Sequence, residues 1–314
     1  MKRRRVGEIE VSRLGLGTLT WGRDTSPKDA RGLLRAFVSA GGNLVDTAAA
    51  YGRGDAERII GKILERDVDR DDIVIATKAG FKVSGMEKVV DTSPRALLDD
   101  LRGSLKRLGT DHIDIWQLHA WDDEHSLETT LEAMDQAVQA GYAREIGVSN
   151  FVGWQLSQAA TRQRDLGKAP VASAQAEYSL LARGAEYEII PACQHLGVAF
   201  LPWSPIGRGV LTGKYQVAAP TGSRGNSSNF SWFVEPYLEP GPSQIVKAVQ
   251  VAADGLELTP AQVALLWVRD APGVTAPLLG PRNAAQLKPY LQVEDLELPA
   301  EIVSALDDVS GGPK

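Results

Sequence analysis

Four side chains that can move protons or carry charge follow short apolar runs in the first half of the chain. Asp46 ends the run NLVD, Lys78 ends DIVIATK, His119 ends HIDIWQLH, and Tyr51 follows Asp46 within TAAAYG. A Tyr hydroxyl has an ordinary pKa of about 10, and a neighbouring ammonium stabilises its phenolate. Together these residue types suit proton delivery to an oxygen that is gaining negative charge.

The spacing also indicates how the four groups would divide the work. We expect Asp46 to hold Lys78 in place and keep it charged, and Lys78 to lower the pKa of Tyr51. A neutral His119 would then donate a hydrogen bond to a carbonyl oxygen. Any one of these residues alone is more often structural, but four at the ends of neighbouring runs favour the functional interpretation. A Schiff-base role for Lys78, as in a barrel aldolase or isomerase, needs a neutral amine, and a carboxylate partner argues against it.

The elements that must position these residues alternate between apolar runs and helical segments. Near-continuous apolarity over a few residues is typical of strands buried on both faces of a parallel sheet. Ser-Pro or Thr-Pro at the start and Gly at the end mark the helices that we expect over 26–41, 93–109, 126–141 and 259–273. The expected strands lie in 13–18, 43–46, 72–78, 112–119, 144–150, 171–175, 198–203 and 276–280.

Eight such units in 314 residues predict an α/β fold of the (β/α)8 TIM-barrel type, in which the carboxyl ends of the strands converge on one face. A doubly wound sheet also alternates, but Gly15-Leu16-Gly17 lacks the third glycine of the dinucleotide fingerprint. Residues 2–12 read as an N-terminal hairpin turning at Gly7-Glu8. No linker interrupts the pattern, so we expect 1–314 to form one domain, with the Gly/Ser-rich segment 216–231 as a lid.

Composition excludes several classes of protein. The 34 basic and 40 acidic residues give a net charge of −6, and no basic stripe follows Lys2–Arg5, so nucleic acid and anionic membranes are not expected partners. The apolar runs fall far short of the roughly 18 residues of a membrane span, and no signal peptide is expected. Cys193 is the single cysteine, which excludes a disulfide framework and a Cys-based metal site. We therefore expect a cytoplasmic protein without a bound metal.

Several blocks of sequence resemble the aldo-keto reductases, in the family's order and from about residue 6 to 308. These blocks are NLVDTAAAYG, VIATK, DIWQLH, GVSNF, QAEYSLLAR, LPWSPIGRGVLTGKY and LLGPRNAAQL. The resemblance implies an NADPH-dependent reductase of a small aldehyde or ketone, built on a barrel with an N-terminal hairpin plug. It also implies a catalytic tetrad in which Tyr51 is the general acid, Lys78 tunes its pKa, Asp46 partners Lys78, and His119 orients the carbonyl.

The strand ends supply candidate contacts for the nicotinamide. Ser149, Asn150 and Gln175 end the fifth and sixth runs, where the resemblance implies contacts with the carboxamide. Asn150 is equally well placed to cap the helix that begins in FVGWQLSQ. Trp203 ends the seventh run and can either stack on the nicotinamide ring or cover the core.

The segment after Trp203 resembles the family's pyrophosphate loop, in which glycines let the backbone approach phosphate closely. A P-loop is excluded, because Arg208 stands where that motif needs glycine and Tyr215 replaces Ser or Thr. The residues expected near the pyrophosphate are Ser204, Pro205, Ile206, Gly207, Arg208 and Lys214.

A second phosphate site is expected where the eighth run leads into a helix. Barrels commonly seat phosphate there, and Gly280 lets the backbone come close. Arg282 fits the 2′-phosphate of NADPH, which favours NADPH over NADH. Gln286 is expected to touch the adenine or ribose, and Thr18, at the end of the first run, also faces the cofactor. Pro289-Tyr290 replaces the family's usual Glu-Asn pair, so its adenine contacts are not expected here.

Aromatic residues on the loops are the candidates for substrate contacts. An apolar slot for an aryl or alkyl carbonyl would be lined by Trp21, Trp121, Trp232 and Phe233, or else the loop tryptophans would form a protein interface. Arg224 would clamp the pyrophosphate or be a solvated loop charge. Nothing in the sequence specifies the physiological substrate, the reaction direction or the oligomeric state.

A non-enzymatic alternative is an NADPH-binding regulatory subunit resembling the potassium-channel β subunits, which share the fold. Those proteins carry Asn at the position of His119, and we expect no long N-terminal extension that could act as a tether here. The complete tetrad therefore favours the enzyme.

Overall fold

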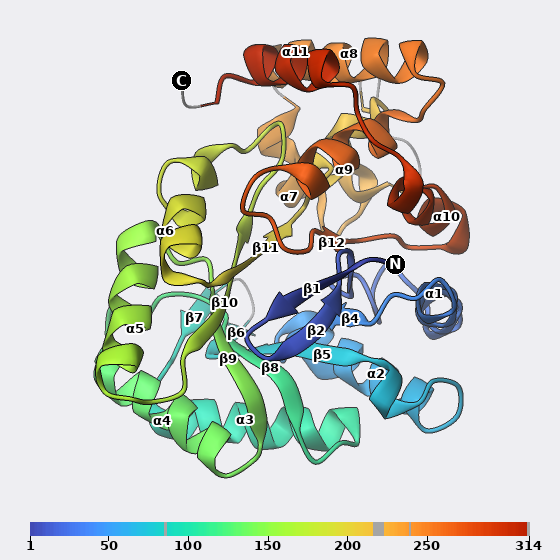
Figure 1. Cartoon of the computed structure of the whole chain (residues 1–314). Helices are drawn as coiled ribbons and strands as arrows, with labels where there is room; N and C mark the ends of the chain where they lie inside the picture. The colour runs from blue at the N-terminus through green and yellow to red at the C-terminus, as the bar shows by residue number, and fades with distance from the viewer. Residues whose placement is uncertain (85–86, 216–222, 239, 313–314) are drawn as a thin grey trace.

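The computed structural model describes residues 1–84, 87–215, 223–238 and 240–312. Within these residues eight parallel strands close into a barrel, and helices surround it (Figure 1). The predicted (β/α)8 barrel is confirmed, and the doubly wound sheet is excluded. In barrel order the strands are β3 (Gly15–Gly17), β4 (Leu44–Asp46), β5 (Val74–Ala79), β8 (Ile113–Leu118), β9 (Ala143–Ser149), β10 (Val171–Glu177), β11 (Ala199–Trp203) and β12 (Leu278–Leu279).

The register of the strands brings the reactive residues to one rim. Asp46 pairs with Gly17 on one side and with Ala76 on the other, and Lys78 pairs with Gln117. Because all barrel strands run in the same direction, their carboxyl ends lie together at this rim.

Most predicted helix starts use the expected side-chain caps. The hydroxyls of Ser26, Ser93 and Thr259 each accept a backbone N–H of the first turn. Ser126 differs, because its hydroxyl donates to the Glu128 carboxylate at 2.7 Å instead. The helices are α1 (Pro27–Ser39), α2 (Asp55–Leu64), α3 (Pro94–Leu108), α4 (Leu127–Gln139), α5 (Gly153–Asp165), α6 (Ile189–Leu196), α7 (Ser231–Val234), α8 (Pro240–Gly255), α9 (Pro260–Asp270), α10 (Ala284–Gln292) and α11 (Ala300–Ser310).

Two hairpins flank the barrel. The predicted N-terminal one consists of β1 (Arg3–Val6) and β2 (Ile9–Ser12), and its buried Val6 and Val11 join the cluster of side chains inside the barrel. The other, β6 (Phe81–Ser84) and β7 (Glu87–Val90), directly follows β5 and was not predicted. It places Phe81 at the rim beside His119.

The expected lid is partly structured. Residues 216–222 and the side chain of Arg224 lie outside the described part of the chain. The rest of the segment forms a short 3-10 turn (Arg224–Asn226) and leads into α7, and the side chains of Phe230 and Val234 are buried. This part of the segment is therefore packed onto the barrel and is not the structureless loop that the sequence suggested. Among the described residues, no helix is long and apolar enough to cross a membrane.

Candidate active site

A buried ion pair lies at the ends of β4 and β5. The Nζ atom of Lys78 lies 2.8 and 2.7 Å from the two carboxylate oxygens of Asp46 and 2.9 Å from the Thr47 carbonyl oxygen. Lys78 and Asp46 are only 1% and 3% exposed. Burial alone would lower the pKa of Lys78, but the charge interactions and hydrogen bonds with Asp46 and Tyr51 together outweigh burial and raise it. The amine therefore stays protonated, which disfavours a Schiff-base role.

Tyr51 lies beside this pair, at the start of a 3-10 turn (Tyr51–Gly54) that follows β4. The Lys78 ammonium is 5.2 Å from the centre of the Tyr51 ring. Burial raises the pKa of Tyr51, the Lys78 charge opposes this, and the net direction is upward. The sequence predicted a lowered pKa. Lys78 acts in the predicted direction, but the desolvation of the phenol is larger, so Tyr51 holds its proton at neutral pH.

His119 directly follows β8 and faces Tyr51. The two rings lie 5.9 Å apart in an edge-to-face arrangement, and Phe81 packs 4.9 Å from the imidazole. Burial, reinforced by the charge of Lys78, lowers the pKa of His119 to about 3. The imidazole is therefore neutral at physiological pH. Its Nδ1 atom is buried and has no hydrogen-bond partner among the described residues, so packing holds the ring.

A chain of buried amides orients the Asp46 carboxylate. Gln175 donates from Nε2 to Asp46 at 2.8 Å and to Gln117 at 3.2 Å, and Gln117 donates to the Ser173 hydroxyl at 3.0 Å. The hydroxyl of Thr18 donates to the Asp46 carbonyl oxygen at 3.0 Å. Sequence analysis missed Gln117, although a polar residue inside the apolar run DIWQL was a signal, because buried polar groups need partners.

These groups border a cavity of about 280 Å³ at the carboxyl ends of the strands. Asp46, Tyr51 and His119 line it, whereas Lys78 lies behind Asp46. Among the described residues, no group of three or more His, Cys, Asp or Glu side chains is arranged to hold a metal ion. The predicted cofactor residues that line the cavity are Thr18, Ser149, Asn150, Gln175, Trp203, Ser204, Pro205, Ile206 and Gly280. Lining residues that were not predicted include Leu19, Thr20, Arg23, Phe81 and Phe230.

Asn150 links two sides of this cavity. Its backbone adopts a left-handed conformation, with φ of 58°, and its amide donates to the His119 carbonyl oxygen at 2.9 Å. The side-chain oxygen accepts the Trp203 indole N–H at 3.1 Å. Asn150 is therefore not a helix cap, since Val152 occupies the cap position of α5. It fixes Trp203 relative to the loop that carries His119.

Arg208 does not line the cavity, in contrast to its predicted contact with pyrophosphate. Its guanidinium binds both carboxylate oxygens of Glu177, at 2.8 and 2.6 Å, and donates to the Phe233 carbonyl oxygen at 2.6 Å. The same group lies 4.0 Å from the centre of the Phe233 ring. Arg208 thus holds Phe233 in place, and the Phe233 ring stacks on Trp203 in the lining of the cavity.

Other predicted phosphate ligands also lie outside the residues that line the cavity. Gly207 has φ of 55° and packs against Leu181, and both features favour glycine at this position. Lys214 lies over the Tyr215 ring, 5.1 Å from its centre. The side-chain oxygen of Gln286 accepts the backbone N–H of Arg282 at 2.9 Å.

Arg282 is held near the start of α10 by an acid that sequence analysis missed. Its Nη1 lies 3.1 Å from a carboxylate oxygen of Asp24, and the other carboxylate oxygen accepts the Asn229 amide at 2.9 Å. Burial raises the pKa of Asp24, but hydrogen bonds from Ser227 and Asn229 and the Arg282 charge outweigh it, so the net shift is downward. Asp24 thus joins the first loop to the segments after β11 and β12.

Of the three loop tryptophans predicted to contact substrate, only Trp232 borders the cavity, together with the predicted Phe233. Trp232 lines it and is 55% exposed. Trp21 is wholly buried because its loop turns the indole inward, and Leu19 and Thr20 line the cavity in its place. Trp121 is also outside the lining, where it packs edge-on against Trp154 with ring centres 5.2 Å apart. Both of these interpretations are corrected.

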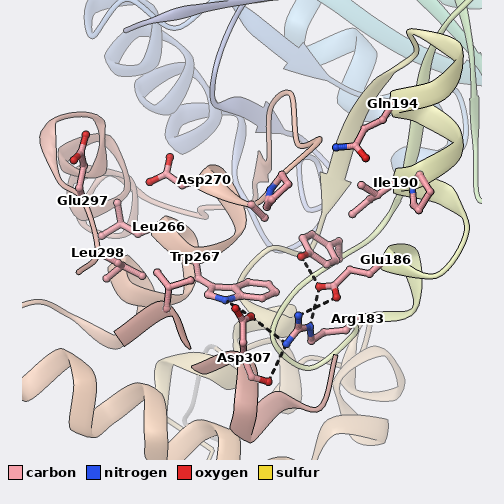
Figure 2. A pocket seen from close by; sticks show the side chains of 15 residues that line it. Arg183, Glu186, Ile190, Gln194, Leu266, Trp267, Asp270, Glu297, Leu298 and Asp307 are labelled. Atoms are coloured by element: carbon pink, nitrogen blue, oxygen red, sulfur yellow. Dashed lines mark hydrogen bonds and ion pairs between the residues drawn. The ribbon is translucent and has the colours of Figure 1, made fainter. Parts of the chain in front are cut away.

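A larger cavity of about 600 Å³ lies between α6, α9 and α11 (Figure 2). Several of its polar groups are bonded to one another: Arg183 pairs with Glu186 at 2.8 Å and with Asp307 at 3.1 Å. Tyr178 donates to Glu186 at 2.6 Å, and the Trp267 indole donates to Asp307 at 3.1 Å. This network joins the segment after β10 to α9 and α11 and contains none of the tetrad, so we interpret it as structural.

Comparison with known proteins agrees with this geometry. A closed barrel with an acid–base cluster at the carboxyl ends of its strands defines an enzyme-like (β/α)8 protein. The family model "Aldo/keto reductase family" matches residues 13–310, and the chain belongs to this family of oxidoreductases.

Similar curated proteins cover almost the whole chain. "Uncharacterized oxidoreductase YrpG" of Bacillus subtilis is 34% identical, over 97% of this chain and 94% of the relative. "Aldo-keto reductase YhdN" of the same organism is 30% identical over 93% and 88%. "Protein tas" of Escherichia coli is 33% identical over 96% and 94%.

Proposed function

We propose that the protein reduces an aldehyde or ketone to the alcohol with NADPH, in a reversible hydride transfer in which Tyr51 donates the proton. The observation that carries this proposal is the buried Asp46–Lys78 pair beside Tyr51, with His119 in the same cavity. Among the described residues that line this cavity, the titratable side chains are those of Arg23, Asp46, Tyr51 and His119.

The residues of the cavity fit a nicotinamide cofactor. Trp203 offers an aromatic face, and Ser149 and Gln175 offer a hydroxyl and an amide oxygen at the same rim. Arg282 lies near the N-terminus of α10, where backbone N–H groups and a guanidinium both favour phosphate. When bound, NADPH supplies the hydride; the protein supplies position and charge.

The chain's own residues account for the proton. As the substrate oxygen gains negative charge, Tyr51 transfers the proton of its hydroxyl to that oxygen, and Lys78 stabilises the phenolate that remains. Asp46 keeps Lys78 charged and in place. The neutral His119 ring donates its single N–H to the same oxygen, which lowers the energy of the charged state.

The substitution Tyr51→Phe tests this mechanism. It removes one hydroxyl and keeps the ring that packs against His119, so we expect turnover of 4-nitrobenzaldehyde to fall by more than 10²-fold, the lower end of general-acid contributions. The dissociation constant of NADPH, measured by fluorescence titration, should stay within twofold. Tyr142→Phe, at a half-exposed tyrosine before β9, is the matched control.

Either of two results would refute the assignment. Near wild-type turnover by Tyr51→Phe excludes Tyr51 as the proton donor. NADPH binding by the wild-type protein without turnover of any carbonyl in a broad panel favours the regulatory-subunit alternative.

A further inference from the structure

One cationic side chain lines the cavity from the loop after β3. Among the described residues that border it, Arg23 is the sole cation, since His119 is neutral and Lys78 lies behind Asp46. The single acid in the lining, Asp46, is neutralised by Lys78 and hydrogen-bonded by Gln175. The lining of the cavity therefore carries a net positive charge on its solvent-exposed side, and this charge comes from Arg23.

The acidic residues next to Arg23 form ion pairs with other residues. Asp24 holds Arg282 and Asn229, and Asp55, which packs against Gly22, pairs with Arg58 at 2.7 Å. Within the part of the chain that the structure describes, the Arg23 guanidinium has no ion pair or hydrogen bond of its own. It remains available for an anion that enters the cavity.

The backbone that carries Arg23 is a tight loop closed by several hydrogen bonds. The N–H of Arg23 and the N–H of Thr25 both donate to the Thr20 carbonyl oxygen, at 3.2 and 2.9 Å, and the hydroxyls of Thr20 and Thr25 lie 2.7 Å apart. The wholly buried Trp21 anchors the loop. An arginine on a fixed backbone loses less conformational freedom when it binds, which increases its contribution to affinity.

This loop packs beside the turn that carries Tyr51. A Cβ atom at Gly52 would lie only 3.3 Å from the Trp21 carbonyl oxygen, so the two backbones are in close contact. The same cavity therefore holds a proton donor and a guanidinium, on adjacent loops. The aromatic side chains of Phe230 and Trp232 line the same cavity and suit the apolar body of a substrate.

We propose that Arg23 selects carbonyl substrates that carry a carboxylate, such as an aromatic aldehyde acid, with the anionic group placed away from the reacting carbon. A guanidinium binds a carboxylate through two parallel hydrogen bonds, which gives both charge and orientation. The inference rests on the proposed function, because it assigns the second recognition group of the same site. The pyrophosphate of the cofactor carries similar anionic oxygens, so the test must separate the two ligands.

The test compares a charged aldehyde with a neutral one of similar shape. We expect the wild-type protein, saturated with NADPH, to have a higher kcat/KM for 4-carboxybenzaldehyde than for methyl 4-formylbenzoate. Arg23→Gln should lower kcat/KM for the carboxylate at least tenfold, mainly through KM, a loss of about 1.4 kcal/mol or more. The value for the ester and the dissociation constant of NADPH should change less than twofold. Arg95→Gln, on the exposed start of α3, is the control.

A charge reversal gives a second, independent readout. Arg23→Glu should reject 4-carboxybenzaldehyde and favour 4-(trimethylammonio)benzaldehyde, while its turnover of the ester shows that the variant is folded and active. Equal wild-type kcat/KM for carboxylate and ester, or equal losses for both in Arg23→Gln, would overturn the inference. Weaker NADPH binding with unchanged selectivity would also overturn it and assign Arg23 to the pyrophosphate.

Failure of the proposed function gives a different result from failure of this inference. If the wild-type protein binds NADPH but turns over neither aldehyde, the reductase assignment fails. In that case, the binding of benzoate to the NADP-loaded protein is measured by the quenching of tryptophan fluorescence. This measurement decides the role of Arg23. At least tenfold weaker binding by Arg23→Gln supports the anion site, and equal binding by the two proteins overturns it.

Discussion

The Asp46–Lys78 pair allows a quantitative test on folding stability and activity together. The closest atoms are 2.7 Å apart and the side chains are 4% exposed or less, so solvent screens the pair poorly. With an effective dielectric constant of about 20, the attraction at this distance is about 6 kcal/mol. Desolvation of the two charges costs several kcal/mol for each, so the pair as a whole stabilises the fold little or not at all.

Removing one partner is a different perturbation from removing both. Lys78→Met leaves the Asp46 carboxylate buried with the Gln175 amide and without a counter-charge, and we expect a loss of about 3–5 kcal/mol in the free energy of unfolding. Asp46→Asn should cost a similar amount, because it leaves a buried ammonium. The double variant removes both charges, so it should be at least as stable as either single variant.

The assay is urea unfolding of the four proteins at pH 7, with kcat measured in parallel. We expect a coupling energy of at least about 3 kcal/mol between the two positions. Lys78→Met and the double variant should lose activity by more than 10²-fold, because Tyr51 loses the ammonium that stabilises its phenolate. Asp46→Asn should also lose activity, because the buried amine loses the carboxylate that keeps it charged and in place. Two additive losses of less than 1 kcal/mol each would refute the description of these charges as a dehydrated pair. Recovery of activity by the double variant would refute the role of the ammonium.

Two further predictions concern phosphate and pH. Arg282→Ala should raise the dissociation constant of NADPH more than tenfold and scarcely alter that of NADH; equal losses for both cofactors would contradict the 2′-phosphate assignment. The folded-state pKa of His119 is about 3, below its ordinary value of 6.5, so the unfolded chain binds the extra proton first as pH falls. Because of His119, the free energy of unfolding should fall by about 2 kcal/mol as the pH falls from 8 to 5. This part of the pH dependence should be absent in the variant His119→Asn. A wild-type kcat profile with a limb near pH 6.5 that vanishes in His119→Asn would show instead that the imidazole titrates there.

Much of the fold could be predicted because its signals are local. Proline and a capping hydroxyl at a helix start, as at Ser26 and Ser93, depend only on residues within one turn. The helix that was expected over 259–273 ends at Asp270, because Gly273 lies in the connection beyond it. The hairpin β6–β7 was missed because its two strands are only four residues long. Sequences of this length cannot be told from the loops that normally follow barrel strands.

The tetrad could be anticipated for a geometric reason. In a parallel barrel every strand ends at the same rim, so residues that directly follow successive strands become neighbours whatever the intervening helices contain. The sign of the Tyr51 pKa shift could not be anticipated, because it depends on how deeply the phenol is buried. Neighbouring charges can be inferred from spacing, whereas desolvation is a property of the assembled site.

The sequence by itself determined the barrel, its hairpin plug and which residues follow each strand, since hydrophobic period, caps and strand direction set them. The directions of the long side chains on the loops were decided only by the tertiary structure. Arg208 is bound by Glu177, 31 residues away, and Arg282 by Asp24, 258 residues away, so neither partner is visible in a local pattern. The same packing turned Trp21 into the core and left Arg23 facing the cavity. Loop side chains take their direction from long-range contacts, because no regular backbone hydrogen bonding fixes it.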